Sequence, residues 1–137
     1  EIEINKATGV LKVLECVASV DCGVTLNPNL AKIQVEGALV QGLGMALTEQ
    51  ANRGSKGQLY NNTFLNYGGP TKMDFGKLDV SFVDSYEPSG PFGAKSVGEI
   101  GIDTPPAVIS NAIKNAIGHR MKVLPMTSEK IWRKINK

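Results

Sequence analysis

The segment Val10–Val20 constrains the fold most, because it carries apolar side chains on both of its alternating faces. Its apolar positions are Val10, Leu11, Val13, Leu14, Val17 and Val20. Such a run is typical of a central strand, whose two faces are both covered. The first five residues also alternate, with Ile2 and Ile4 on one face, and a turn ends at Gly9. We therefore predict an amino-terminal hairpin whose second strand lies inside a sheet.

The period becomes helical between Leu30 and Gln50. The stripe expected to be buried consists of Ile33, Gly37, Val40, Gly44 and Leu47. Glycines at positions 37, 42 and 44 interrupt this helix, and each interior glycine costs about 1 kcal/mol relative to alanine. That cost indicates a place where another backbone or a ligand must come close.

Three shorter elements follow. Leu78–Val83 alternates as a strand. A helix is expected to begin at the capping residues Asp103 or Thr104 and to end at Gly118. A last helix is expected to begin at Thr127 or Ser128, with Ile131, Trp132 and Ile135 on its buried side. Strands and helices without regular alternation predict an α+β fold with a mixed sheet, as a single domain of residues 1–137.

Composition excludes several classes of protein. Apolar residues make up 42% and charged residues 20% of the chain, and the net charge is +2, which is typical of an ordinary globular domain. The only dense basic stretch is Lys130, Arg133, Lys134 and Lys137, which is interpreted as a solvated helix face. We expect no nucleic-acid binding and no membrane association. The two cysteines set no disulfide framework, and no signal peptide opens the chain. Both observations favour a cytoplasmic location.

The first candidate site is Gln41-Gly42-Leu43-Gly44. Helix packing would ordinarily favour larger side chains at these two glycine positions. The glycines therefore indicate either close packing of the helix or the approach of a ligand. The pattern alone is a weak signal and does not decide between them. Gln41 adds a side chain that both donates and accepts hydrogen bonds beside this backbone.

The second candidate site is the glycine-rich segment Gly90–Gly101, where Glu99 stands between Gly98 and Ile100-Gly101. One interpretation is an exposed loop acid, since glutamate is usually exposed. The other is a carboxylate in a tight pocket, whose pKa would be raised by burial and which would act as a general base. Lys95 is either an anion contact or a surface amine. The lone His119, with no second histidine and no spaced cysteines, gives little support to a protein-ligated metal.

Taken in order along nearly the whole chain, these segments resemble the carboxy-terminal part of the molybdopterin-binding large subunit of the xanthine dehydrogenase and aldehyde oxidase family, the molybdenum hydroxylases. The segments that carry the resemblance are Asp21-Cys22-Gly23, Asn27-Pro28, Val35-Glu36-Gly37, Gln41-Gly42-Leu43-Gly44 with Glu49, Asn66-Tyr67, Pro70-Thr71, Gly90-Pro91, Gly93-Ala94-Lys95-Ser96-Val97-Gly98-Glu99, Pro106–Ile113, Asn115-Ala116 and Gly118. One departure is Ile100, where many relatives have proline.

The resemblance implies an activity and a set of site residues. The family hydroxylates N-heterocycles or aldehydes with oxygen from water. Glu99 matches its catalytic glutamate, which accepts a proton from a hydroxyl on the metal. The cofactor is molybdenum-molybdopterin, in a mononucleotide or cytosine dinucleotide form, held through its own dithiolene. Its expected contacts are Gln41, Gly42, Gly44, Lys95, Ser96, Val97 and Gly98.

The same resemblance implies that the chain is a fragment of something longer, which we predict to be inactive alone. Its expected partners are the remainder of the large subunit, together with iron–sulfur and flavin (FAD) domains or subunits. The alternative is a stand-alone, non-catalytic domain of this family that binds partners or serves as an assembly module. The full reading frame distinguishes the two.

Overall fold

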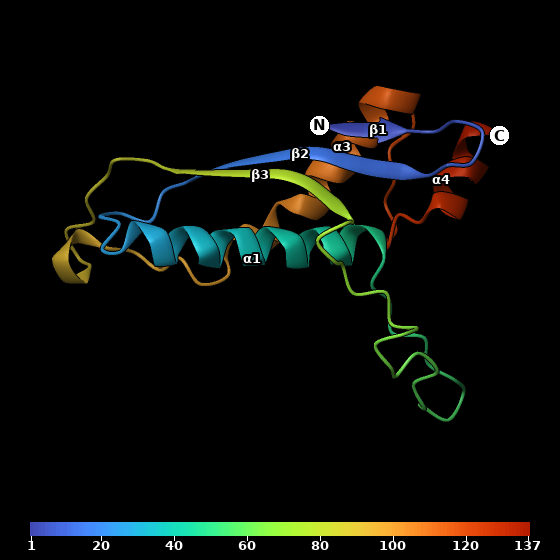
Figure 1. Cartoon of the computed structure of the whole chain (residues 1–137), viewed down its shortest axis with the longest axis horizontal. Coiled ribbons are helices and arrows are strands. Elements are labelled where there is room, and N and C mark those ends of the chain that lie inside the picture. The colour runs from blue at the N-terminus through green and yellow to red at the C-terminus, as the bar shows by residue number, and fades with distance from the viewer.

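A computed structural model describes residues 1–137 and contains a mixed three-stranded sheet (Figure 1). The strands β1 (Ile2–Ile4), β2 (Leu11–Val20) and β3 (Phe75–Phe82) lie in the order β1-β2-β3. β1 pairs antiparallel with β2, and β3 pairs parallel with it. The predicted hairpin, the central position of the second strand and the α+β class with a mixed sheet are all confirmed.

A bulge divides β2 into two parts. The amides of Leu14 and Glu15 both donate to the carbonyl oxygen of Glu1, at 2.9 and 3.3 Å, so two residues of β2 oppose the one residue that precedes β1. The core-facing positions therefore change from Val13, before the bulge, to Cys16 after it. β3 follows β2 closely here, since a Cβ at Gly76 would lie 1.9 Å from the oxygen of Leu14.

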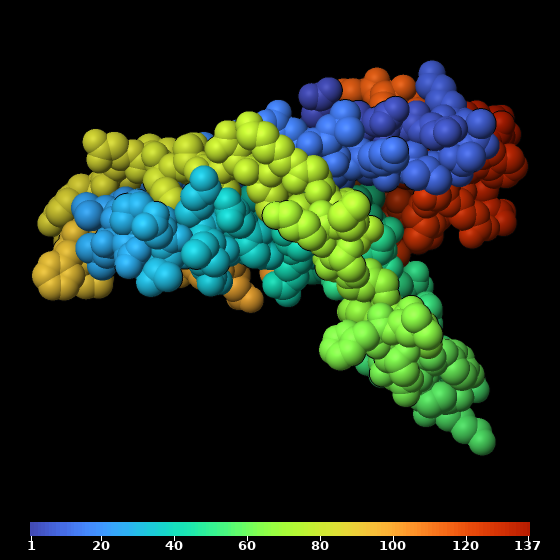
Figure 2. All heavy atoms as spheres, in the orientation of Figure 1, coloured from blue at the N-terminus to red at the C-terminus, as the bar shows by residue number.

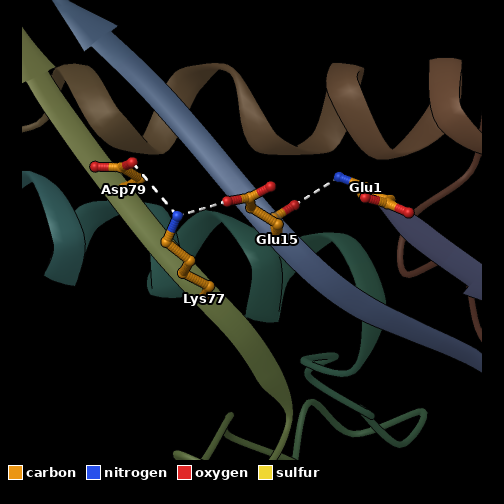
Figure 3. A network of polar contacts seen from close by, with 4 residues as sticks. All are labelled: Glu1, Glu15, Lys77 and Asp79. Carbon is orange, nitrogen blue, oxygen red and sulfur yellow. Dashed lines mark hydrogen bonds and ion pairs between the residues drawn. The ribbon is translucent and has the colours of Figure 1, made fainter.

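Charged side chains connect the strands on the outer face of the sheet (Figure 3). The Lys77 amine lies 2.9 Å from Glu15 and 3.6 Å from Asp79, and the amino terminus of Glu1 donates to the Glu15 carbonyl at 2.6 Å. Hydrogen bonding and charge, mainly from Glu15, raise the pKa of Lys77. Exposed pairs of this kind contribute about 0–1 kcal/mol, so apolar packing on the other face dominates the stability of the sheet.

Helix α1 (Pro28–Leu47) runs along the inner face of the sheet (Figure 1). Asn27 begins it, and its side chain accepts a hydrogen bond from the Leu30 amide at 3.2 Å. The predicted buried stripe is wrong in its first half, because Ile33 and Gly37 are exposed. The buried positions are Val35, Ala38, Leu39, Gly42, Leu43, Gly44 and Ala46. Apolar residues occur all round this helix, so periodicity did not identify the face that meets the sheet and the later helices.

The carboxy-terminal half consists of short helices. These are η1 (Pro91–Gly93), α2 (Ile100–Asp103), α3 (Pro105–Ile117) and α4 (Ser128–Ile135). α3 ends at Gly118 as predicted, with φ of +78° there. Thr104 precedes α3 but its side chain makes no capping bond, contrary to expectation. α2 was not predicted.

The last helix packs as expected at two of its three predicted core positions. In α4, Ile131 is fully buried and Ile135 is partly buried. Trp132, however, is 44% exposed, so that prediction is wrong. Only one narrow side of this short helix meets the core.

The core has two parts. Around Val13, the amino-terminal hairpin, the end of α1, α3 and α4 bury Leu43, Ala46, Ile109, Ile113, Met121, Met126 and Ile131. Around Val20, the far end of β2, β3 and the middle of α1 bury Cys22, Val35, Leu39 and Val80. No helix is both long enough and apolar enough to cross a membrane.

Residues between α1 and β3 form an arm that projects from the body (Figures 1 and 2). Asn61 holds its base: the side-chain amide donates to the Gln50 carbonyl at 2.5 Å, and its oxygen accepts from the Asn52 amide at 2.9 Å. Phe64 and Leu65 are almost fully exposed on this arm.

We predict opposite effects of alanine at two glycines of α1. A Cβ at Gly42 would lie 2.7 Å from Pro105 and 2.9 Å from the Ile102 oxygen, whereas one at Gly37 meets nothing within 4 Å. Gly42→Ala should lower the free energy of unfolding by about 1–3 kcal/mol through overpacking. Gly37→Ala should raise it by about 0.4–1 kcal/mol. Denaturant unfolding measures both, and equal effects would contradict the packing assigned to Gly42.

Candidate functional site

The segment before Glu99 is hydrogen-bonded to the chain that leaves β2. The Lys95 amide donates to the Cys22 carbonyl at 2.7 Å, and the Val24 amide donates to the Gly93 carbonyl at 2.8 Å. Gly23 and Ala94 form an isolated antiparallel bridge. Two glycine-containing turns, far apart in the sequence, are thereby held side by side at the end of the sheet.

A charged cluster strengthens this connection. The Lys95 amine lies 2.7 Å from the Asp21 carboxylate. The Ser85 hydroxyl and the Gly23 amide also donate to that carboxylate. The hydrogen bond from Lys95, followed by those from Ser85 and Gly23, holds the pKa of Asp21 far below its usual range. Lys95 therefore fixes the loop, in addition to the cofactor contact expected for it.

Helix α1 holds the other side of the loop. The Gln34 side chain donates from Nε2 to the Gly98 carbonyl at 2.7 Å. Gly101 lies against α1, where a Cβ would be 2.9 Å from that of Ala38. The chain is thus fixed on the same helix on both sides of Glu99, at Gly98 before it and at Gly101 two residues after it.

Glu99 is the N-cap residue immediately before α2, and the Ile102 amide donates to its carbonyl at 3.0 Å. Its side chain is exposed and makes no capping bond. The tight pocket expected around this carboxylate is not formed by these 137 residues. Its backbone position is defined, while its carboxylate faces outward.

A cleft of about 550 Å³ lies beside this loop. One wall is the beginning of α1, including Leu30 and Gln34, and the other is the loop at Lys95, Val97 and Gly98. Ser96 lies in the same turn, where its hydroxyl accepts from the Gly98 amide at 3.4 Å. Three of the predicted cofactor contacts, Lys95, Val97 and Gly98, therefore line one cleft, and Ser96 lies between them in the same turn. The Lys95 amine is paired with Asp21, so the exposed backbone of this turn is what suits an anionic, hydrogen-bonding cofactor such as a pterin phosphate.

The other predicted contacts do not line this cleft. Gly42 packs against Pro105, and a Cβ at Gly44 would lie 2.8 Å from Pro70. Close packing thus accounts for both glycines. Gln41 has an exposed side chain, and its contact with a cofactor stays a prediction.

Gln34 is the site residue that the sequence reasoning missed. It precedes Gln41 by two helical turns, and positions seven apart share a helix face. A polar side chain just before the Val35-Glu36-Gly37 segment was an available signal. Elsewhere, no group of three or more His, Cys, Asp or Glu side chains comes together in a way that could hold a metal ion.

Comparison with known proteins decides the family. The model of the molybdopterin cofactor-binding domain matches residues 1–76. The chain belongs to this family.

Individual relatives agree over almost all of the chain. It is 36% identical to the aldehyde oxidoreductase molybdenum-binding subunit of Escherichia coli, over 98% of this chain and 19% of that protein. It is 33% identical to the nicotine 6-hydroxylase large subunit of Paenarthrobacter nicotinovorans, over 96% of this chain and 16% of that protein.

Solved structures agree as well. Quinoline 2-oxidoreductase from Pseudomonas putida 86 gives a TM-score of 0.91 at 28% identity, over 99% of this chain and 18% of that chain. Aldehyde oxidoreductase from Desulfovibrio gigas gives a TM-score of 0.90 at 33% identity, over 99% of this chain and 15% of that chain. The predicted family and its cofactor class are confirmed, and the chain spans less than a fifth of these relatives.

We predict that the ion pair between Lys95 and Asp21 stabilises the loop in a pH-dependent way. Because the Asp21 pKa is lowered on folding, the ion pair contributes its full stabilisation of the loop above the unfolded pKa of about 3.9. It is lost as the pH falls through the folded value. Lys95→Met should speed hydrogen exchange at the Lys95 and Val24 amides at neutral pH.

Lys77→Met is the matched control, since Lys77 makes ion pairs on the outer face of the sheet. It should leave exchange in the 93–98 loop unchanged. Equal exchange in the wild type and in Lys95→Met would contradict the contribution of this ion pair.

Proposed function

We propose that this chain supplies the catalytic base and part of the cofactor cleft of a molybdenum hydroxylase, which hydroxylates N-heterocycles or aldehydes with oxygen from water. The single observation that carries the proposal is the position of Glu99. The chain belongs to this family, and its Glu99 directly follows Gly98, which lines the cleft and accepts a hydrogen bond from Gln34.

The chain's own residues have distinct tasks in this proposal. Lys95, Ser96, Val97 and Gly98 form the loop that faces the cofactor. Gln34 and the Asp21–Lys95 pair hold that loop, so the carboxylate of Glu99 is presented from a fixed backbone. Glu99 accepts the proton that leaves water-derived oxygen, which suits a positioned carboxylate. The molybdenum-molybdopterin cofactor supplies, when bound, the redox centre that accepts two electrons from the substrate.

The names of the relatives support a substrate class. Their names include an aldehyde oxidoreductase, a nicotine 6-hydroxylase and a quinoline 2-oxidoreductase. An aldehyde carbon and a ring carbon beside nitrogen are both electron-poor and open to attack by oxygen. We therefore propose a small aldehyde or N-heterocycle as substrate.

Relatives of this chain act as subunits of multi-subunit complexes, for example the gamma subunit of the 6-hydroxypseudooxynicotine dehydrogenase complex. For this chain, we propose the remainder of the large subunit as the direct partner. Iron–sulfur and flavin domains or subunits would carry the electrons onward. The Fe–S and FAD groups therefore belong outside these 137 residues.

We predict that Glu99→Gln in the full-length enzyme lowers kcat by about 10²–10⁴, the usual contribution of a general base. Molybdenum content must be equal in the two preparations. Asp103→Asn is the matched control, because Asp103 is an exposed carboxylate on the same short helix. It should retain nearly full turnover. If the Glu99→Gln enzyme turns over as fast as the wild type at equal molybdenum content, Glu99 is not the base.

We predict different results for the two glutamines of α1. Gln34→Leu removes the hydrogen bond to Gly98, and a misplaced catalytic group should lower kcat by about 10- to 100-fold, with KM little changed. Gln41→Leu tests the contact implied by the family resemblance, and should lower cofactor loading. Steady-state kinetics and pterin content measure both. A normal kcat of the Gln34→Leu enzyme would show that Gln34 does not position Glu99.

A further inference from the structure

The central strand has an unpaired edge beyond the bulge. The pairing of β1 with β2 ends at Ile2 and Val13, while β2 continues to Val20. In an extended strand, successive residues direct their backbone groups to opposite edges. The Val20 carbonyl accepts from Val83 on the β3 side. Hence Val17 and Ser19 direct their N–H and C=O groups to the open edge.

An apolar groove of about 600 Å³ runs along this edge. One wall is β2 itself, and Leu39 and Leu43 of α1 form the base. The opposite wall consists of α2 and α3, where Ile100 and Val108 are 42% and 53% exposed. A free strand edge beside an open apolar groove suits an added strand, which pairs the backbone and covers the apolar side chains.

We propose that the occupant is an extended segment of the remaining large subunit, which continues β1 beyond Glu1 and pairs antiparallel with β2 as far as Ser19. The direction is already set, because the Glu1 nitrogen lies 2.6 Å from the Glu15 carbonyl, where a ladder bond belongs. Polypeptide is available, since the chain covers only 14–19% of its curated relatives. A small apolar ligand would leave the backbone groups of Val17 and Ser19 without partners, which is unfavourable once they are covered.

The register follows from the bulge. Glu1 opposes both Leu14 and Glu15, so the residue before Glu1 lies opposite Cys16. The second residue before Glu1 lies opposite Val17. Directly opposed residues of antiparallel strands have Cα atoms about 4.5–5.5 Å apart, within the range that a disulfide spans.

The test is disulfide trapping in the full-length large subunit. Val17→Cys is combined with cysteine at the second residue before Glu1. Mass spectrometry identifies the crosslinked peptides and distinguishes the designed disulfide from any disulfide of the native Cys16 or Cys22. Glu3→Cys with Lys12→Cys is the positive control, because these residues are register partners and both are exposed. Val17→Cys with cysteine at the third preceding residue, whose side chain points to the other face, is the out-of-register control.

We expect the Val17 pair to crosslink as fully as the positive control, and the out-of-register pair to crosslink far less. An uncrosslinked Val17 pair beside a crosslinked positive control would overturn the proposal. Crosslinking between two copies through Val17→Cys would also overturn it, in favour of an interface between copies. A full-length protein with no residues before Glu1 would do the same. The readout does not depend on turnover, so it fails or succeeds separately from the proposed activity.

Discussion

The close approach of α1 to the segment around α2 is the contact on which the candidate site depends. Each partner contributes a glycine to it: Gly42 of α1 receives Pro105, and Gly101 of α2 receives Ala38. Any side chain at either glycine would push the two helices apart. Because Glu99 immediately precedes α2, its position relative to the cleft is set by this packing and by the Gln34 hydrogen bond.

Strand β2 supports the same site from the other direction. It lies between β1 and β3, and the chain that leaves it carries Asp21, Cys22 and Gly23. Asp21 and Cys22 bind Lys95 through an ion pair and a backbone hydrogen bond, and Gly23 forms a strand-like bridge with Ala94. The apolar core around Val20 thus positions a loop that has few apolar contacts of its own. A local motif could not produce this arrangement, because its two halves lie more than 60 residues apart in the sequence, as for Gln34 and Gly98.

Local signals predicted the elements that local interactions determine. Alternation predicted β1 and β2, and Gly118 predicted the end of α3 because its φ of +78° favours glycine. The buried face of α1 was predicted wrongly at Ile33 and Gly37, because α1 packs against β3, α2 and α3, which lie far from it in the sequence. The family resemblance predicted Glu99 as the base, the 95–98 loop as a cofactor contact and the cofactor class, and the comparisons confirm the cofactor class. It directed attention to Gln41, whereas the hydrogen bond that fixes the loop comes from Gln34.

These residues fix the backbone of Glu99 and leave its carboxylate uncovered. Gly98, before it, lines the cleft beside α1, and Ile100, after it, lines the groove along β2. Glu99 therefore lies in the chain between two residues that line different hollows, each open to further protein or cofactor. In the proposed enzyme, the groups that fill these hollows would complete the surroundings of the Glu99 carboxylate. In that proposal the two tasks are divided: this chain holds the backbone of the base, and the rest of the subunit with its cofactor encloses its carboxylate.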